Sequence, residues 1–178
     1  MKKEKLLDLQ LNKEHYNAEA AIVWCFDARH KPSYDALVAQ RGYRNPDPIF
    51  VAGGAKDIIH GEDAIKEYLL WLLAASMKLH NTHHIILMMH TDCGAYKDIY
   101  AKSGQDWHDF LNGDLSKAHE IVESYCNSHP NAEVCKKYWA ANGKAVDRIT
   151  VELVIADFDG IYRVFPSEFL LEKEKLTV

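Results

Sequence analysis

The stretch "IILMMHTDCGAY", residues 85–96, joins an apolar run to a group of reactive side chains. The run is short and apolar throughout, which predicts a buried strand. It leads directly into His90, Asp92 and Cys93. Histidine nitrogen and cysteine sulfur are good ligands for a soft or borderline metal ion such as zinc. Two ligands make a weak site, so a metal site here requires a third ligand elsewhere in the chain.

Other segments predict the strands that join this one in a sheet. The runs "AAIVWCF" (20–26) and "IFVA" (49–52) predict short buried strands, and the strand at the opening stretch spans residues 83–89. The segment "RITVELVIADFDGIYRVF" (148–165) alternates and carries an Asp-Gly turn, which predicts a hairpin. Helices between strands imply right-handed βαβ units. We therefore predict an α/β fold with a mostly parallel central sheet, about four parallel strands plus an antiparallel edge strand, flanked by helices.

Residues 62–80 give the clearest helix prediction. Acidic residues crowd the first turn, and Lys78 and His80 lie in the last, as the helix macrodipole prefers. From Leu69 to Ala75 the segment is apolar nearly all round, which predicts cover on more than one face. We expect the sheet on one face and a second protomer on the other.

The remaining segments complete one predicted domain over residues 1–178. Leucines among charged residues predict an amphipathic helix over residues 3–16, and thus an N-terminal helical arm of about residues 1–17. Residues 94–142 are expected to be mostly helical, with breaks at "SGQD" (103–106), "NGD" (112–114) and "SHPN" (128–131). No internal repeat or linker divides the sequence.

The composition limits the classes of partner and the compartment. A net charge of -5 and a pI of about 6.0 argue against nucleic-acid binding, which usually needs a basic face. No apolar run approaches the roughly 18 residues of a membrane span, and the N-terminal sequence lacks the apolar core of a signal peptide. We predict a cytoplasmic protein without nucleic-acid or membrane partners. In a reducing cytosol, its 4 cysteines are expected to be thiols or metal ligands.

The segment "WCFDARH" (24–30) supplies the third ligand. Cys25 ends the first predicted strand, and His90 and Cys93 follow the third. In an open α/β sheet, sites form in the crevice beyond the carboxyl ends of the strands, so these segments are expected to meet there. Together they make a Cys₂His set with a fourth position open, the pattern of a catalytic zinc site.

Asp27 and Arg29 extend this site. Along an extended segment, residues 25, 27 and 29 point to one face, which lines up a ligand, a carboxylate and a guanidinium. A carboxylate can orient a metal-bound water, and a bidentate pair with arginine can hold that carboxylate off the metal. If the pair broke, Asp27 would close on the zinc as a fourth ligand.

These residues resemble the β-class carbonic anhydrases. The resemblance rests on C-x-D-x-R at Cys25, Asp27 and Arg29 and on H-x-x-C at His90 and Cys93. It extends to "AGG" (52–54) before the long helix and to the closing hairpin. Within the family pattern, His30 stands where an apolar residue is common, and Phe50–Val51 stand where a basic residue and Asn are usual. None of these departures removes a ligand.

The resemblance implies reversible hydration of CO₂ to bicarbonate and a proton, through zinc-bound hydroxide. It assigns Zn²⁺ to Cys25, His90 and Cys93, and it makes Asp27 and Arg29 the orienting catalytic pair. It also implies a homodimer or a larger assembly, because the family buries apolar helices between protomers.

Other interpretations of the same residues stay open. The ligand set could be two core cysteines and a strand-end histidine, and the Asp27–Arg29 pair could be structural. Gly53 and Gly54 either bring the backbone close to a substrate pocket or form a turn. Cys126 and Cys135 are expected to be thiols of the hydrophobic core. The alternative is a second metal site that they form together with His129.

The alternatives for function follow from the same site. COS and CS₂ resemble CO₂ in shape, so hydrolysis of either is an alternative reaction. A non-catalytic zinc- and bicarbonate-binding homologue is another, motivated by "FVAGGA" (50–55) and His30. His30 itself either relays protons to solvent or caps a loop.

Overall fold

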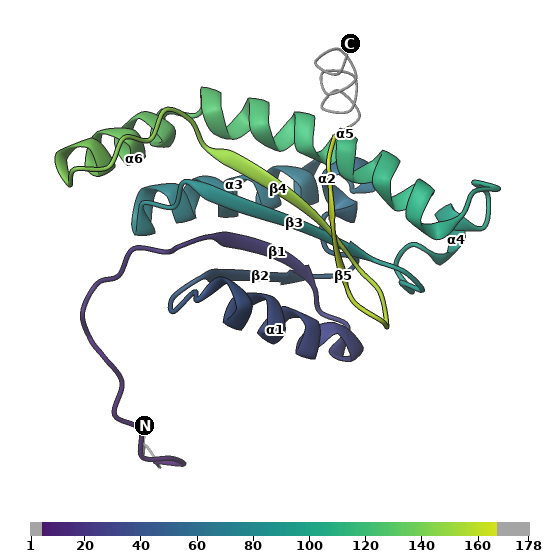
Figure 1. The fold of residues 1–178 in the computed structure, drawn as a ribbon, viewed down its shortest axis with the longest axis horizontal. Coiled ribbons are helices and arrows are strands. Elements are labelled where there is room, and N and C mark those ends of the chain that lie inside the picture. Colours follow the sequence, from purple (N-terminus) through teal and green to yellow (C-terminus); the bar gives the residue numbers. More distant parts are fainter. Residues whose placement is uncertain (1–4, 167–178) are drawn as a thin grey trace, which may run out of the picture.

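The computed structural model describes residues 5–166 of the chain (Figure 1). Its elements are, in chain order, β1 (Ala21–Cys25), the 3₁₀ turn η1 (Ala28–His30), α1 (Lys31–Arg41), β2 (Asp47–Val51), α2 (Lys56–His60), α3 (Asp63–His80), β3 (His84–His90), α4 (Lys97–Tyr100), α5 (Trp107–Ser128), α6 (Pro130–Ala141), β4 (Thr150–Ala156) and β5 (Ile161–Val164).

The strands form a 5-stranded sheet in the order β2-β1-β3-β4-β5. The pairs β1–β2, β1–β3 and β3–β4 are parallel, and β4–β5 is antiparallel. The predicted mixed α/β class, with four parallel strands and an antiparallel edge strand, is confirmed. The predicted hairpin is also confirmed, since β4 and β5 flank the Asp159–Gly160 turn.

Helices cover both faces of the sheet. Figure 1 shows α1 on one side of the strands and α5 with α6 on the other. On the α1 side, the ring of Tyr34 packs edge-on against buried Trp24 of β1, with centroids 5.7 Å apart. On the other side, α5 contacts β3 and β4, and α3 packs against α2, α5 and α6. The central strands β1 and β3 are thus covered on both faces, as their continuous apolar runs predict. No helix in residues 5–166 is long and apolar enough to cross a membrane.

Gly54 fixes the loop after β2 against the centre of the sheet. It has a φ of +62°, and a Cβ placed on it would lie 2.1 Å from the carbonyl oxygen of Met88. The next residue, Ala55, donates its backbone N–H to that same oxygen at 3.0 Å. Only glycine permits both the left-handed backbone and this close approach. The turn predicted at "AGG" is therefore also a packing contact with β3.

The helix predicted over residues 3–16 is wrong for the residues described. Residues 5–20 contain no helix, and Figure 1 shows the N-terminal segment running away from the body of the molecule. The leucines that gave the amphipathic pattern are exposed: Leu6 (90%), Leu7 (68%), Leu9 (64%) and Leu11 (73%). A short helix is marginal in water without a surface to bury its apolar face, and these leucines have no such surface.

The helix break predicted at residues 112–114 is also wrong. The helix α5 continues through Asn112, Gly113 and Asp114. Asp114 is buried, and its carboxylate lies 2.6 Å from Nε2 of His60 on α2 and 3.2 Å from Nζ of Lys117. Tertiary pairing of this carboxylate therefore outweighs the weak helix propensity of the Asn-Gly-Asp triplet.

Replacement of Gly54 by alanine is expected to destabilise the fold strongly, by at least about 3 kcal/mol, because the new methyl group must displace the backbone of β3. Gly42 is the matched control: it has a φ of +67° and open space around it. Gly42→Ala is expected to cost only about 1 kcal/mol, from backbone strain alone. Urea denaturation of the two variants measures the difference, and equal midpoints would contradict the close packing of Gly54.

Candidate metal centre

The parallel pairing of β1 with β3 brings the three predicted ligands together. The register Val23↔Leu87 sets the carboxyl ends of the two strands side by side. Cys25 is the last residue of β1 and His90 the last of β3, and Cys93 follows in the loop. The ligand atoms of Cys25, His90 and Cys93 all lie within 4.8 Å of one another, and all three residues are buried. The chain therefore assembles a Cys₂His group from residues 65 positions apart in its sequence.

His90 is oriented as a metal ligand. Its Nδ1 lies 2.8 Å from the backbone carbonyl oxygen of Thr91, so Nδ1 carries the proton and donates it. Nε2 then presents a lone pair, and it is buried without a hydrogen-bond partner. A second ring nitrogen held by a backbone carbonyl is the usual support of a metal-bound imidazole. The donor set and the unpartnered Nε2 fit a zinc ion.

The sulfur of Cys25 is prepared to carry negative charge. Backbone N–H groups of Gly53 and Asp27 donate to its Sγ at 3.3 and 3.5 Å. The hydrogen bond from the thiol of Cys93 stabilises the Cys25 thiolate most, and the pKa of Cys25 falls to about 4. The same hydrogen bond, together with burial, raises the pKa of Cys93. The pair thus releases a first proton readily, and a cation is needed to hold both sulfurs as thiolates.

Asp27 and Arg29 form the predicted ion pair, but a turn brings them together. Residues 28–30 form η1, so the predicted extended segment is wrong, and Asp27 caps this turn by accepting the backbone N–H of Arg29 at 3.0 Å. The Arg29 side chain binds the carboxylate in a bidentate manner, with Nε–Oδ1 at 3.1 Å and Nη2–Oδ2 at 2.6 Å. These bonds to Arg29 hold the pKa of Asp27 well below its usual range. In this structure Asp27 pairs with Arg29 and is not part of the ligand group.

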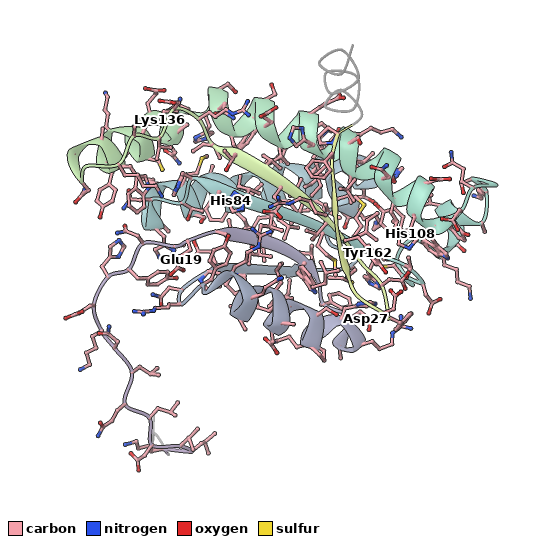
Figure 2. The ribbon with its side chains drawn as sticks, viewed as in Figure 1. Glu19, Asp27, His84, His108, Lys136 and Tyr162 are labelled. Atoms are coloured by element: carbon pink, nitrogen blue, oxygen red, sulfur yellow. The ribbon has the colours of Figure 1, made fainter. Side chains whose placement is uncertain are left out.

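Several groups for which no role was predicted hold the ligand loop in place. Asp92 binds Arg29, with Nη1–Oδ2 at 2.8 Å. Thr91 donates its hydroxyl to Asp157 at 2.6 Å, and its backbone N–H to the carbonyl oxygen of Ala156 at 3.2 Å. Two features of the sequence could have indicated these roles. Asp92 lies between two predicted ligands, and Asp157 lies next to the turn of the predicted hairpin. Figure 2 shows Asp27 and His108 at the same end of the molecule, with His84 farther along the sheet.

A cavity of about 500 Å³ opens beside the ligand group. The predicted ligands Cys25 and Cys93 line this cavity together with Asp27, and most of the other lining residues are alanine or glycine. The lining residues are Cys25, Phe26, Asp27, Ala28, Ala52, Gly53, Cys93, Gly94 and Ala95. Gly53 lines this cavity, whereas Gly54 packs against the backbone of Met88. The cavity suits a small, weakly polar molecule.

His30 does not fit either predicted role. Its ring is buried, with 1% exposed, and packs 4.1 Å from the ring of His90. Neither ring nitrogen has a hydrogen-bond partner, so the side chain neither caps the loop nor reaches solvent. Burial lowers the pKa of His30, which keeps the ring neutral beside His90.

The two remaining cysteines are core thiols. Cys126 and Cys135 are buried and free, and burial raises the pKa of Cys126 to about 12. Cys135 donates to the backbone carbonyl oxygen of Asn81 at 3.2 Å. Among residues 5–166, the only group of three or more possible ligands is the one at Cys25, so the alternative second metal site with His129 is not supported.

Solved structures with a similar fold include carbonic anhydrases. A carbonic anhydrase from Streptococcus mutans gives a TM-score of 0.49 at 18% identity, over 85% of this chain and 84% of the other. The β-carbonic anhydrase isoform I of Trichomonas vaginalis gives 0.45 at 19%, over 89% and 88%. The apo form of a carbon disulfide hydrolase gives 0.44 at 13%, over 90% and 84%.

This chain is similar to carbonic anhydrases of known structure. The likeness predicted from the motifs is confirmed to that extent. No family model matches the sequence, and the curated proteins give no match either. At these TM-scores and identities the likeness says nothing of the reaction, which depends on the site itself.

The metal centre predicts which cysteines matter for zinc. Wild-type protein is expected to bind one zinc ion per chain, and Cys93→Ala is expected to weaken binding at least about 100-fold, because two protein ligands remain. Cys126→Ala is the matched control, since it removes a buried thiol outside the group. Competition with a chromogenic chelator measures both affinities. Equal affinity in the two variants would rule out the predicted ligand set.

Proposed function

We propose that this protein catalyses the zinc-dependent, reversible hydration of CO₂ to bicarbonate and a proton. The observation that carries the proposal is the convergence of Cys25, His90 and Cys93 within 4.8 Å, with His90 Nε2 left unpartnered and buried. The sequence resemblance to β-class carbonic anhydrases supports the same reaction. When bound, a zinc ion supplies an acidified water as the nucleophile.

In the proposed reaction, the ligands and the residues around them have separate roles. Cys25, His90 and Cys93 hold the metal through two thiolates and one imidazole. Asp27, held by Arg29, offers a carboxylate oxygen at the cavity and accepts a hydrogen bond from the attacking water. Because Arg29 keeps this carboxylate charged, it remains an acceptor throughout the neutral pH range. The small residues of the cavity leave room for a linear molecule next to that oxygen.

The lining of the cavity is also compatible with one alternative class of substrate. Apart from the ligands and Asp27, the lining side chains are apolar or absent, as at Ala28, Ala52 and Gly94. Such walls accept sulfur as readily as oxygen, so COS or CS₂ would also fit. Hydrolysis of these molecules, and binding of zinc and bicarbonate without turnover, are the alternatives that the assay below separates.

We also propose that the protein acts as a homodimer or a larger assembly in the cytoplasm. Large apolar side chains on one stretch of α3 are exposed: Ile65 (45%), Tyr68 (56%), Trp71 (58%) and Leu79 (56%). Ile65, Tyr68, Leu72 and Leu79 follow a helical spacing and share one face, and such a continuous apolar stripe is typical of a protein interface. All 4 cysteines are free, which suits a reducing compartment.

Stopped-flow CO₂ hydration on zinc-loaded protein tests the proposed reaction. Wild type is expected to hydrate CO₂ well above buffer, and Asp27→Asn is expected to lose at least about 100-fold in rate, because the carboxylate acceptor is gone. Asp35→Asn, at an exposed carboxylate on α1, is the matched control. Wild-type rates equal to buffer would refute CO₂ hydration. Release of H₂S from COS or CS₂ by the same sample would then assign the alternative substrate.

Sedimentation velocity tests the assembly. Tyr68→Glu is expected to shift the protein to monomer, because it places a charge within the α3 stripe. Val134→Glu alters another exposed apolar side chain, on α6 and outside the stripe, and is expected to leave the assembly unchanged. A wild-type monomer, or dissociation by both substitutions, would contradict this interface.

A further inference from the structure

Asp92 has an unusual backbone for its position. It lies between the ligands His90 and Cys93 with a φ of 53°, one of two non-glycine residues of the described chain in the left-handed region. Asparagine, aspartate and glycine tolerate this conformation best, and glycine adopts it without strain. A turn alone therefore does not require a carboxylate here. The side chain of Asp92 must be explained by what it contacts.

Within residues 5–166, the hydrogen bonds of Asp92 are all with Arg29. Its Oδ2 accepts from Nη1 at 2.8 Å, and its backbone carbonyl oxygen accepts from Nη2 at 3.1 Å. The left-handed backbone turns both acceptors toward the same guanidinium. Asp92 is thus a two-point receptor for the outer edge of the Arg29 side chain.

The two carboxylates use different edges of Arg29 and do not compete. Asp27 takes Nε and Nη2, whereas the side chain of Asp92 takes Nη1. The ring of Phe158 lies 5.4 Å from the guanidinium carbon and covers one face. Since the Arg29 side chain is 47% exposed, its bonds to Asp27 alone would leave the outer edge free to rotate into solvent.

We infer that Asp92 is a positioning residue, which holds Arg29 in the orientation that binds Asp27. Its consequence for catalysis rests on the proposed function. With Asp92 in place, Arg29 keeps the Asp27 carboxylate fixed at the cavity. Without it, the guanidinium samples other orientations, and Asp27 is held for a smaller fraction of the time.

The direct readout is the Nε–H group of Arg29, which donates to Asp27 and can be followed by ¹⁵N NMR on metal-free, full-length protein. Loss of its signal in Arg29→Lys assigns it. In Asp92→Asn, exchange of this proton with solvent is expected to be about two- to fivefold faster, the range for one half-exposed charge-assisted contact. Asp92→Gly is expected to behave alike, because it keeps the left-handed turn and loses only the carboxylate.

Asp98→Asn is the control, because it removes a carboxylate from an exposed position on α4 that has no contact with Arg29 among those described. It is expected to leave the exchange rate unchanged. Exchange that is unchanged or slower in Asp92→Asn would overturn the inference, and slower exchange would show that Asp92 competes with Asp27. A urea midpoint for each variant separates these results from global unfolding.

The same variants connect the inference to the reaction. On zinc-loaded protein, Asp92→Asn is expected to lower kcat for CO₂ hydration about two- to fivefold with little change in KM, following the smaller held fraction of Asp27. The metal-free exchange rate still decides the role of Asp92 if wild type hydrates no CO₂. Failure of the proposed function and failure of this inference therefore give different results.

Discussion

The site depends on the parallel pairing of β1 with β3. Apart from the histidines at the two ends of β3, both strands are apolar and buried on both faces, which favours their pairing in the centre of the sheet. Parallel strands end at the same edge, so the pairing alone brings Cys25 next to His90. A shift of register by one residue would turn His90 to the other face and dissolve the ligand group. The hydrophobic core and the metal centre are thus products of the same constraint.

Burial of this group has a cost that a cation would offset. The buried and unpartnered Nε2 of His90 costs about 1–3 kcal/mol in the metal-free protein, the usual penalty for an unsatisfied polar group. The thiols of Cys25 and Cys93 share a single proton unequally, which lowers the pKa of one and raises that of the other. A divalent cation relieves both problems, because it takes the lone pair of His90 and neutralises two thiolates. A purely structural explanation as core cysteines accounts for neither feature.

The sequence predicts this site well where strand ends position the residues, and poorly where a turn positions them. Apolar runs located the strands, and the carboxyl ends of those strands located Cys25, His90 and Cys93. The pair of Asp27 with Arg29 was predicted correctly from spacing but for the wrong geometric reason, because η1 and not an extended segment joins them. Asp92 had no predicted role, since its partner is 63 residues away and a turn, not a periodic pattern, aims it.

Errors in the helix predictions have the same origin. The leucines at the N-terminus satisfy the helical period, but periodicity does not supply the surface that a short helix needs. The Asn-Gly-Asp triplet of α5 weakens a helix locally, but the contact of Asp114 with His60 lies across the fold and is invisible in the sequence. Local propensity therefore fails in both directions, where tertiary contacts are missing and where they are present.

The closing hairpin is part of the metal centre as well as an edge of the sheet. The strand β4 ends beside β3, and from that end Asp157 accepts the hydroxyl of Thr91 while Ala156 accepts its backbone N–H. Phe158, in the turn that follows, covers both Arg29 and the buried ring of His30. Three adjacent parallel strands thus contribute in sequence: β1 brings the first ligand and the Asp27–Arg29 pair, β3 brings the other ligands, and β4 holds their loop in place. Because the loop that carries Cys93 is tied at Thr91 to β4 and at Asp92 to Arg29, it is fixed from both sides before any metal binds.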